Sequence, residues 1–499
     1  MITQILFPGI PPVLDKRTFY VACLPLLLTV WAGVTINILP DEILLHIFHC
    51  SRLWHQGRGR SWKWHRLVHV CRRWQSVVFA SPKYLQLGLV CGPRTPLELI
   101  SVVWPSESLP IIIQDKRDLT LPDDFDFDAA IVHPNRVRKI NLRKINRSQL
   151  TRLVSAMQTK FPALIRLRLD YLRSDRRGYP TLTRGFLGGY APHLQSLGLK
   201  SIAFPPKLLL STTGLVSLNF WDIPPSGYIS PKALVSGLAA SSNLKILIFG
   251  FEFHLYRNVR KSLRPPPPTR TVLPALTYFQ FRGDSDYFEN LVARIEAPLL
   301  ETISISYKSG LISDTPQLAQ FMRCTTTIEA LNEARVGFRY HFVEVKSLSP
   351  NQAVDKKYRL TILCQKPPWL LSSVSSLAQF ISSFLPFIRM VEHLYIRFDR
   401  CHPSKWLGDL RNEAWLEIFR LFTGVKNLYI CKEFAECNVF AWALQEFVGK
   451  RVAIMLPALE SLSLEELQPS EPVREAIEQF VTARQLLGHP VAVSQWNIA

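Results

Sequence analysis

The chain has 499 residues, of which 47% are hydrophobic and 11% aromatic. This composition excludes a largely disordered protein and allows two or three folded units. The formal net charge is +20, which favours acidic partners such as a phosphorylated protein, an acidic protein surface, nucleic acid or an anionic membrane. Nine cysteines are scattered without a C-x-x-C pair, so reduced thiols in the cytosol or nucleus are expected, and a paired-cysteine zinc module is excluded.

We interpret residues 1–35 as an apolar N-terminal extension. The segment 18–38 carries no charge and reaches the roughly 20 residues of a membrane-spanning helix. Lys16 and Arg17 before it are typical of a secretory signal, but Pro25 and several polar residues interrupt the apolar run. We therefore favour a packed extension, with a membrane anchor or a cleaved signal as the weaker alternatives.

The next segment, 36–88, contains two apolar stripes at helical spacing. Pro40 fits the first turn of a helix, and Asp41 and Glu42 place negative charge at the positive end of the helix dipole. About fifty residues of short helices cannot bury two such stripes internally, so we expect them to dock on a partner. The stripes are Ile43, Leu44, Ile47 and Phe48, and then Leu67, Val70, Cys71, Trp74 and Val78.

Two blocks of this segment, Leu39 to Phe48 and Leu67 to Trp74, resemble the F-box, the short helical module that joins a substrate receptor to an SCF-type ubiquitin ligase. The resemblance implies a non-catalytic subunit with no cofactor, which binds a Skp-type adaptor and, through it, a cullin. Leu67 follows Phe48 by nineteen positions, more than the usual F-box loop, which leaves the middle helix open. A helical cap over the next domain is the alternative. The implied adaptor-binding residues are Leu39, Pro40, Ile43, Leu44, Ile47, Phe48, Leu67, Val70, Cys71 and Trp74.

Residues 89–130 are expected to connect this module to the rest of the chain. We interpret the stretch 102–104 as part of a connecting helix and the stretch 109–113 as an opening cap strand.

From 131 to 467 the unit apolar-x-x-apolar-x-apolar recurs, with starts 21 to 34 residues apart except for one gap of 91. One short strand per unit cannot bury its face alone, so the units are expected to stack. Alternating segments at 336–342 and 358–362 are expected to fill two places in the gap. The ten triplets are Val137-Ile140-Leu142, Leu164-Leu167-Leu169, Leu194-Leu197-Leu199, Leu215-Leu218-Phe220, Leu244-Leu247-Phe249, Leu276-Phe279-Phe281, Leu300-Ile303-Ile305, Val391-Leu394-Ile396, Val425-Leu428-Ile430 and Leu459-Leu462-Leu464.

This pattern resembles an irregular leucine-rich-repeat solenoid, and from residue 36 the chain resembles the F-box proteins with such repeats in mushroom-forming fungi. The expected fold class is α/β: a short all-helical F-box, the solenoid, and a C-terminal capping helix with a tail at 468–499. Ser470 is expected to cap that helix, and Gly488 to help end it. A non-repeating α/β domain is the alternative.

Side chains that alternate with the inward-facing ones are expected on the concave surface of such a solenoid. Basic residues at one end and aromatic residues further along suit an acidic or phosphorylated peptide with a hydrophobic anchor. The candidate target-binding residues are Lys139, Arg143, Arg166, Arg168, Trp221, Tyr278, Arg282, Tyr395 and Tyr429.

Two other chemistries have weaker support. His46, His49, Cys50 and His55 lie close together in the sequence. His46 and His49 border an apolar stripe, where amphipathic side chains are common, so no metal site is expected. The blocks around Ser285 and His402 resemble, in order, those of a lipase family, but the serine block lies mid-chain within the repeats, and short matches arise by chance.

The sequence therefore predicts a cytoplasmic or nuclear substrate-recognition subunit of an SCF-type ligase without catalytic residues or a small-molecule substrate. A non-degradative repeat scaffold bound to the adaptor and a basic nucleic-acid-binding repeat protein are the alternatives, the latter less favoured because no nucleic-acid recognition signature accompanies the charge.

Overall fold

In a computed structural model the chain divides into two compact units, residues 1–89 with 106–110 and residues 90–105 with 111–499. The expected extension 1–35, the apolar segment 18–38 and the expected helix at 102–104 lie outside the described residues. In the part of the chain that is described, no helix combines the length and apolar character needed to cross a membrane. The structure describes residues 39–56, 65–82, 84–85, 87–92, 109–115, 122, 125–172, 178–183, 185–206, 209, 212–252, 269–308, 315–325, 332–339, 342–348, 360–365, 382, 388–398, 412–435, 438–448, 455–465 and 470–496.

The first unit is helical. It contains α3 (Asp41–Gln56), the short α4 (His65–Val68), which supplies the middle helix, and α5 (Arg72–Ala80). Asp41 and Glu42 lie in the first turn of α3, where the helix dipole favours negative charge. Cys71 is the N-cap of α5, where its Sγ accepts a hydrogen bond from the Trp74 backbone N–H at 3.5 Å.

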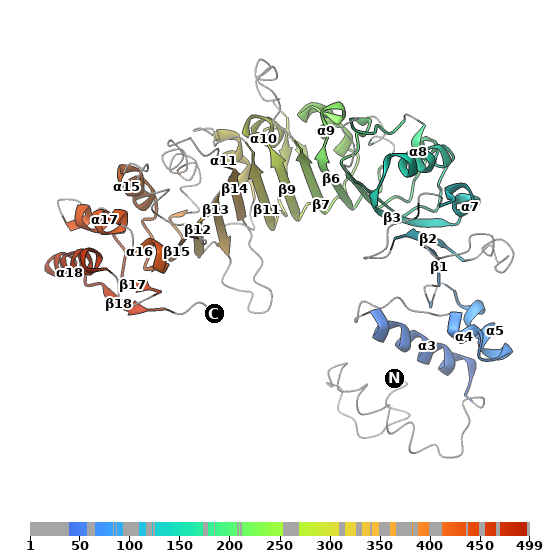
Figure 1. The fold of residues 1–499 in the computed structure, drawn as a ribbon, viewed down its shortest axis with the longest axis horizontal. Coiled ribbons are helices and arrows are strands. Elements are labelled where there is room, and N and C mark those ends of the chain that lie inside the picture. The colour runs from blue at the N-terminus through green and yellow to red at the C-terminus, as the bar shows by residue number, and fades with distance from the viewer. Residues whose placement is uncertain are drawn as a thin grey trace. The chain divides into compact units, whose positions relative to one another are not determined.

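The second unit is built on one sheet of sixteen strands, in the spatial order β1-β2-β3-β4-β5-β6-β7-β9-β11-β14-β13-β12-β15-β16-β17-β18 (Figure 1). The strands are β1 (Leu89–Cys91), β2 (Ile111–Gln114), β3 (Val137–Ile145), β4 (Arg166–Tyr171), β5 (Ser196–Lys200), β6 (Ser217–Ile223), β7 (Ile246–Phe251), β9 (Tyr278–Gly283), β11 (Thr302–Tyr307), β12 (Glu333–Arg339), β13 (Phe342–Leu348), β14 (Leu360–Gln365), β15 (His393–Phe398), β16 (Asn427–Ile430), β17 (Ser461–Leu464) and β18 (Ala492–Gln495). A separate parallel pair joins β8 (Thr271–Val272) to β10 (Ile295–Glu296).

The ten apolar triplets set the register of the sheet. Each triplet ends in a strand parallel to its neighbours, and equivalent positions pair: Leu167 of β4 pairs with Ile140 of β3 and with Leu197 of β5. Every residue of the ten triplets is buried. The predicted α/β fold class, with stacked parallel strands following a helical module, is therefore confirmed.

Helices and short turns cover one side of the strands, as Figure 1 shows for α8, α9 and α10. Phe288 of α10 packs on Phe279 and Phe281 of β9, with ring centroids 5.6 and 4.7 Å apart, so the triplet residues face these helices. The helices of this unit are α7 (Phe127–Ile131), α8 (Arg147–Ala156), α9 (Pro231–Leu238), α10 (Ser285–Val292), α11 (Pro316–Arg323), α15 (Asn412–Leu421), α16 (Lys432–Ala435), α17 (Asn438–Val448) and α18 (Glu471–Leu486).

The described residues of the long gap between triplets form three strands, where two were expected. β14 pairs parallel with β11, and β12 pairs parallel with β15, so both expected segments occupy places in the sheet. β13, which the sequence did not predict, lies antiparallel between them and forms a hairpin with β12. The spatial order is therefore reversed relative to the chain across this insertion.

The C-terminal helix α18 begins after Ser470 as expected, but the Ser470 side chain makes no capping hydrogen bond. Arg484 of α18 is buried and donates to the Leu459 backbone oxygen at 2.9 Å, which ties the helix to the chain just before β17. The expected tail contributes a further strand, β18, which pairs parallel with β17 and extends the sheet by one place.

Candidate functional site

The first unit separates the expected adaptor-binding residues into a buried and an exposed set. Leu44 and Phe48 are buried, with 0% and 1% of their surface exposed. Ile47 and Val70 are 42% and 57% exposed, and Pro40 and Cys71 are also exposed, while Leu39, Ile43, Leu67 and Trp74 are intermediate. On α3, residues four apart share a face, so 44 and 48 form an inward stripe beside the outward stripe of 43 and 47.

Two contacts hold this module together. The Phe48 ring packs on the Trp74 ring of α5 with centroids 4.8 Å apart. The Arg73 guanidinium forms an ion pair with Asp41 at 2.7 Å and donates to the Leu39 backbone oxygen, which fixes the start of α3 against α5. We expected the module to leave both apolar stripes unburied. That expectation was wrong for Leu44, Phe48 and Val78, which are buried.

The histidines considered as metal ligands lie around Tyr84. Its hydroxyl and the His46 Nδ1 form a hydrogen bond of 3.1 Å, and the His49 ring lies 4.8 Å from the Tyr84 ring. These contacts give both histidines a role in packing.

The second candidate surface is the open face of the sheet, which we define by the strand residues that alternate with the buried triplet residues. All nine expected target-binding residues lie on it, each exposed or half-buried. The surface differs along its length, with a basic end on β3–β4, an ion-paired centre on β4–β9 and an aromatic end on β15–β18.

At the basic end, Lys139 of β3 pairs in register with Arg166 of β4. Burial, with Arg166 and Arg143 nearby, lowers the pKa of the Lys139 ammonium group. Arg166 forms no ion pair with any residue that the structure describes. Asp115 lies beside Arg143 and accepts its backbone N–H at 2.8 Å, and Asp170 lies within electrostatic range of the Asp115 carboxylate.

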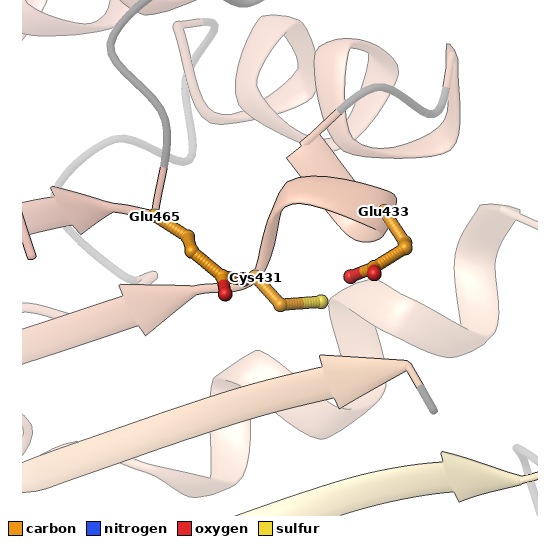
Figure 2. Close-up of side chains that lie close together, drawn as sticks. All are labelled: Cys431, Glu433 and Glu465. Atoms are coloured by element: carbon orange, nitrogen blue, oxygen red, sulfur yellow. The ribbon is translucent and has the colours of Figure 1, made fainter. Parts of the chain in front are cut away.

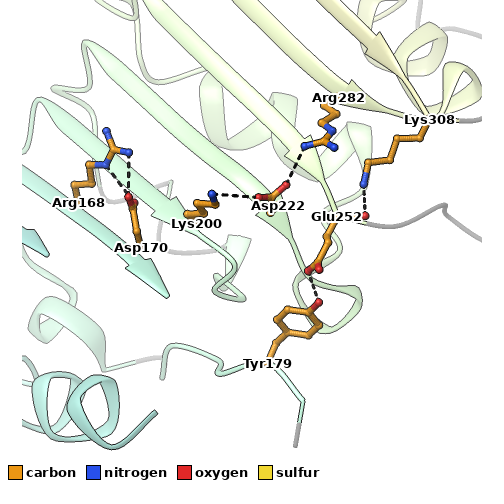
Figure 3. Close-up of polar contacts among 8 residues, drawn as sticks. All are labelled: Arg168, Asp170, Tyr179, Lys200, Asp222, Glu252, Arg282 and Lys308. Carbon is orange, nitrogen blue, oxygen red and sulfur yellow. Dashed lines mark hydrogen bonds and ion pairs between the residues drawn. The ribbon is translucent and has the colours of Figure 1, made fainter. Parts of the chain in front are cut away.

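In the centre, acidic residues neutralise two of the expected target-binding arginines (Figure 3). Arg168 pairs with Asp170 at 3.0 Å on the same strand. Arg282 and Lys200 pair with Asp222 at 3.4 and 3.6 Å. Charge alternates across β4, β5, β6 and β9, so this region does not present a continuous basic surface.

A local backbone irregularity places Asp222 in this network. The pairing of β6 with β7 shifts register after Phe220, and Asp222 adopts a left-handed φ of 52°, a conformation that Asp tolerates better than most residues. Beside it, Lys308 donates to the Glu252 backbone oxygen, and the Tyr179 hydroxyl donates to the Glu252 carboxylate (Figure 3). Burial, followed by the repulsion from Arg282, lowers the pKa of Lys308.

A hollow of about 290 Å³ opens on the same face where Gly198 leaves β5 without a side chain. Trp221 and Ile248 supply its apolar wall, while Arg168 and Lys200 stand at its polar side. The Arg282 guanidinium lies 5.7 Å above the Trp221 ring, which holds the indole in place.

The aromatic end is a ladder of stacked side chains. The Tyr395 and Tyr429 rings are stacked with centroids 4.2 Å apart, and Arg335 lies over the other side of Tyr395 at 4.9 Å. Trp496 contacts both tyrosines edge-on, and its indole N–H donates to the Ile430 backbone oxygen at 3.2 Å. Burial, with Glu333 and Tyr429 nearby, raises the pKa of Tyr395, so its hydroxyl stays neutral.

The sequence did not predict that Trp496 and Arg335 belong to this surface. Trp496 follows the last strand and carries no triplet signal, and Arg335 lies on a strand inside the gap. Their positions become visible only through the pairing of distant strands.

Cys431, Glu433 and Glu465 form a cluster whose potential metal-ligand atoms all lie within 4.8 Å of one another (Figure 2). Glu465 accepts the backbone N–H of Lys432, the first residue of α16, at 3.0 Å. This contact is a helix cap, the ordinary role of a carboxylate at that position. It explains the cluster without an ion.

Of the lipase-like match, the structure describes the serine block. Ser285 is the first residue of α10 and is 2% exposed, and His402 lies outside the described residues.

A comparison with curated proteins finds no match for this chain. Among solved structures, the chain is similar to the leucine-rich repeat-containing protein LegL7 from Legionella pneumophila, with 14% identity and a TM-score of 0.29, over 72% of this chain and 96% of that one. At that score the likeness carries no argument, and the fold assignment rests on the strand register. Residues 36–91 match the family described as F-box-like, a module typical of non-catalytic interaction proteins that bind Skp-type adaptors. This part of the chain is therefore an F-box-like domain.

Proposed function

We propose that this protein is the substrate-recognition subunit of an SCF-type ubiquitin ligase. Its F-box-like domain binds a Skp-type adaptor and, through it, a cullin, while the open face of the sheet binds a protein target. Ubiquitin transfer takes place on other subunits, and this chain contributes proximity and orientation.

The observation that carries the proposal is the exposed apolar surface of the F-box-like domain. Ile47 and Val70 are large apolar side chains that the domain leaves in water, although it buries Leu44 and Phe48 completely. Burying one such side chain against a partner contributes roughly 1.5–3 kcal/mol relative to leaving it exposed. The adaptor interface that we propose therefore uses Ile47 and Val70 with the neighbouring exposed Pro40 and Cys71, while the buried pair supports them.

The first test is co-purification of the full-length chain with a Skp-type adaptor and a cullin. Wild-type protein should retain both. Ile47→Asp and Val70→Asp should each lose them without a change in thermal stability, because a surface substitution usually alters stability by less than about 0.5 kcal/mol. A matched control is Val132→Asp, an exposed apolar residue of the second unit. Equal retention by all four proteins would contradict the proposed interface.

A second test separates a degradation receptor from a non-degradative scaffold. Proteins captured by the full-length chain should accumulate as ubiquitylated species when the proteasome is inhibited, and the accumulation should vanish with Ile47→Asp. Captured proteins that show no ubiquitin-dependent accumulation would favour the scaffold.

A further inference from the structure

The basic end of the open face brings positively charged side chains together, and few of them have an acidic partner among the described residues. Lys139 and Arg166 are register partners on adjacent parallel strands, and Arg143 lies near enough to repel the Lys139 ammonium group. Asp115 lies next to Arg143, and Asp170, within electrostatic range of Asp115, is paired with Arg168. The Lys139 ammonium group donates a hydrogen bond to the neutral Gln114 side-chain oxygen at 3.5 Å. Such a cluster favours an anionic group on a partner.

The hollow beside it has a different chemistry. Its cations already have acidic partners, since Arg168 pairs with Asp170 and Lys200 with Asp222. Its apolar wall is formed by Trp221 and Ile248. An additional anion gains little there, whereas an apolar side chain fills the space that Gly198 leaves empty.

The spacing of the two features defines the shape of a ligand that reaches both. Arg166 of β4 pairs with Ser196 of β5, so Gly198 lies two residues further along the strands than the Lys139–Arg166 pair. It also lies one and a half strand intervals from the middle of that pair. At about 4.8 Å per interval and about 3.3 Å per residue, these offsets of about 7.2 and 6.6 Å combine to about 9.8 Å. A polyproline-II segment has three residues per turn and a rise of 3.1 Å, so side chains at i and i+3 point the same way about 9.3 Å apart. In a β-strand, positions i and i+3 point to opposite sides.

We propose that the open face recognises a target segment in polyproline-II conformation, with an anionic side chain on Lys139 and Arg166 and an apolar side chain three residues away in the hollow over Gly198. This proposal rests on the proposed function, because it specifies the target class of the same surface. The anion is a phosphate or a carboxylate, and the experiment distinguishes them.

The test uses fluorescein-labelled peptides with one anionic residue and one leucine, joined by proline spacers so that their separation is two, three or four positions. The anionic residue is phosphoserine, glutamate or, as the uncharged reference, serine. Binding to the full-length chain is measured by fluorescence anisotropy. Separation three should bind at least about tenfold more tightly than separations two and four, because the polyproline-II helix turns the second side chain away in the other two.

Three variants of the protein identify the two subsites. Gly198→Val fills the hollow and should weaken binding of the separation-three peptide at least about tenfold. Thr302→Val, on the open face in β11 and outside both subsites, should leave it unchanged. A β-carbon at Gly198 meets the flexible Arg168 side chain at 3.4 Å, a contact that this side chain can relieve. Lys139→Glu combined with Arg166→Glu should abolish the preference for phosphoserine or glutamate over serine, and it tests the proposal independently if Gly198→Val does not fold.

Binding that is independent of spacing, or unchanged in the Lys139→Glu, Arg166→Glu double variant, would overturn the inference. Adaptor capture is measured on the same preparations. Retained capture without selective peptide binding would refute the inference alone, and selective peptide binding without adaptor capture would refute the proposed function alone.

Discussion

Replacing Phe48 by alanine should strongly destabilise the F-box-like domain while leaving the sheet intact. The Phe48 side chain is 1% exposed and packs on Trp74, so its truncation costs about 3–5 kcal/mol from lost burial and the remaining cavity. Folded domains have about 0.05–0.15 kcal/mol of stability per residue, which amounts to about 2.5–7.5 kcal/mol for a helical unit of about fifty residues. The substitution therefore removes about half or more of this margin.

The assay is hydrogen–deuterium exchange with mass spectrometry on the full-length chain. Peptides from α3 and α5 should exchange at least about a hundredfold faster in Phe48→Ala, because each 1.4 kcal/mol lost from a local opening free energy raises its equilibrium constant tenfold. Peptides from β4 and β5, in the other unit, should not change. Ile47→Ala, at a residue 42% exposed, is the matched control and should exchange like the wild type. Equal exchange in Phe48→Ala and wild type would refute the core described for this domain.

Three further outcomes follow from the open face. Asp222→Asn keeps a residue that tolerates the left-handed backbone but frees Arg282 from its ion pair, so it should strengthen binding of the phosphoserine peptide in anisotropy while costing no more than about 1 kcal/mol in chemical denaturation. Folding lowers the pKa of Lys139, so the unfolded chain binds this proton more tightly than the folded chain does. The charged Lys139 side chain therefore destabilises the folded state at a pH below the lowered pKa. Above the ordinary pKa of 10.5 the side chain is neutral in both states, and this destabilisation is absent. Lys139→Met should therefore raise the melting temperature at pH 7 and raise it less near pH 10, and an equal gain at both would contradict this. Trp496→Phe loses the hydrogen bond to Ile430 but keeps an aromatic ring, so it should cost about 0.5–1.5 kcal/mol in denaturant unfolding, and no change would argue against that bond.

The stacked sheet could be predicted because each strand repeats the same local pattern. The fixed spacing of each apolar triplet predicts which residues of a short strand face inward. Ten such strands can bury their apolar faces only if they stack side by side. The insertion between β11 and β15 was less predictable, because the β12–β13 hairpin depends on pairing between segments rather than on a repeated unit. Alternation indicated two strands there but not their reversed order.

The candidate surfaces were predicted only in part. In α3 an apolar stripe of four residues spans two adjacent helical faces, and the pattern alone does not state that Leu44 and Phe48 face inward while Ile47 faces water. On the open face, the sequence predicts the positions of Arg168 and Arg282 but not their neutralisation by Asp170 and Asp222. The ion pair of Asp222 with Arg282 depends on an irregularity in β6 that the residue spacing does not predict. The fungal resemblance stays a prediction.

Isothermal titration of the purified full-length chain with a Skp-type adaptor tests the proposed receptor role directly. We expect saturable binding with one adaptor per chain, and an affinity at least tenfold lower for Ile47→Asp in a protein that melts like the wild type. No heat of binding and no complex by gel filtration for the folded wild-type chain would contradict the receptor role.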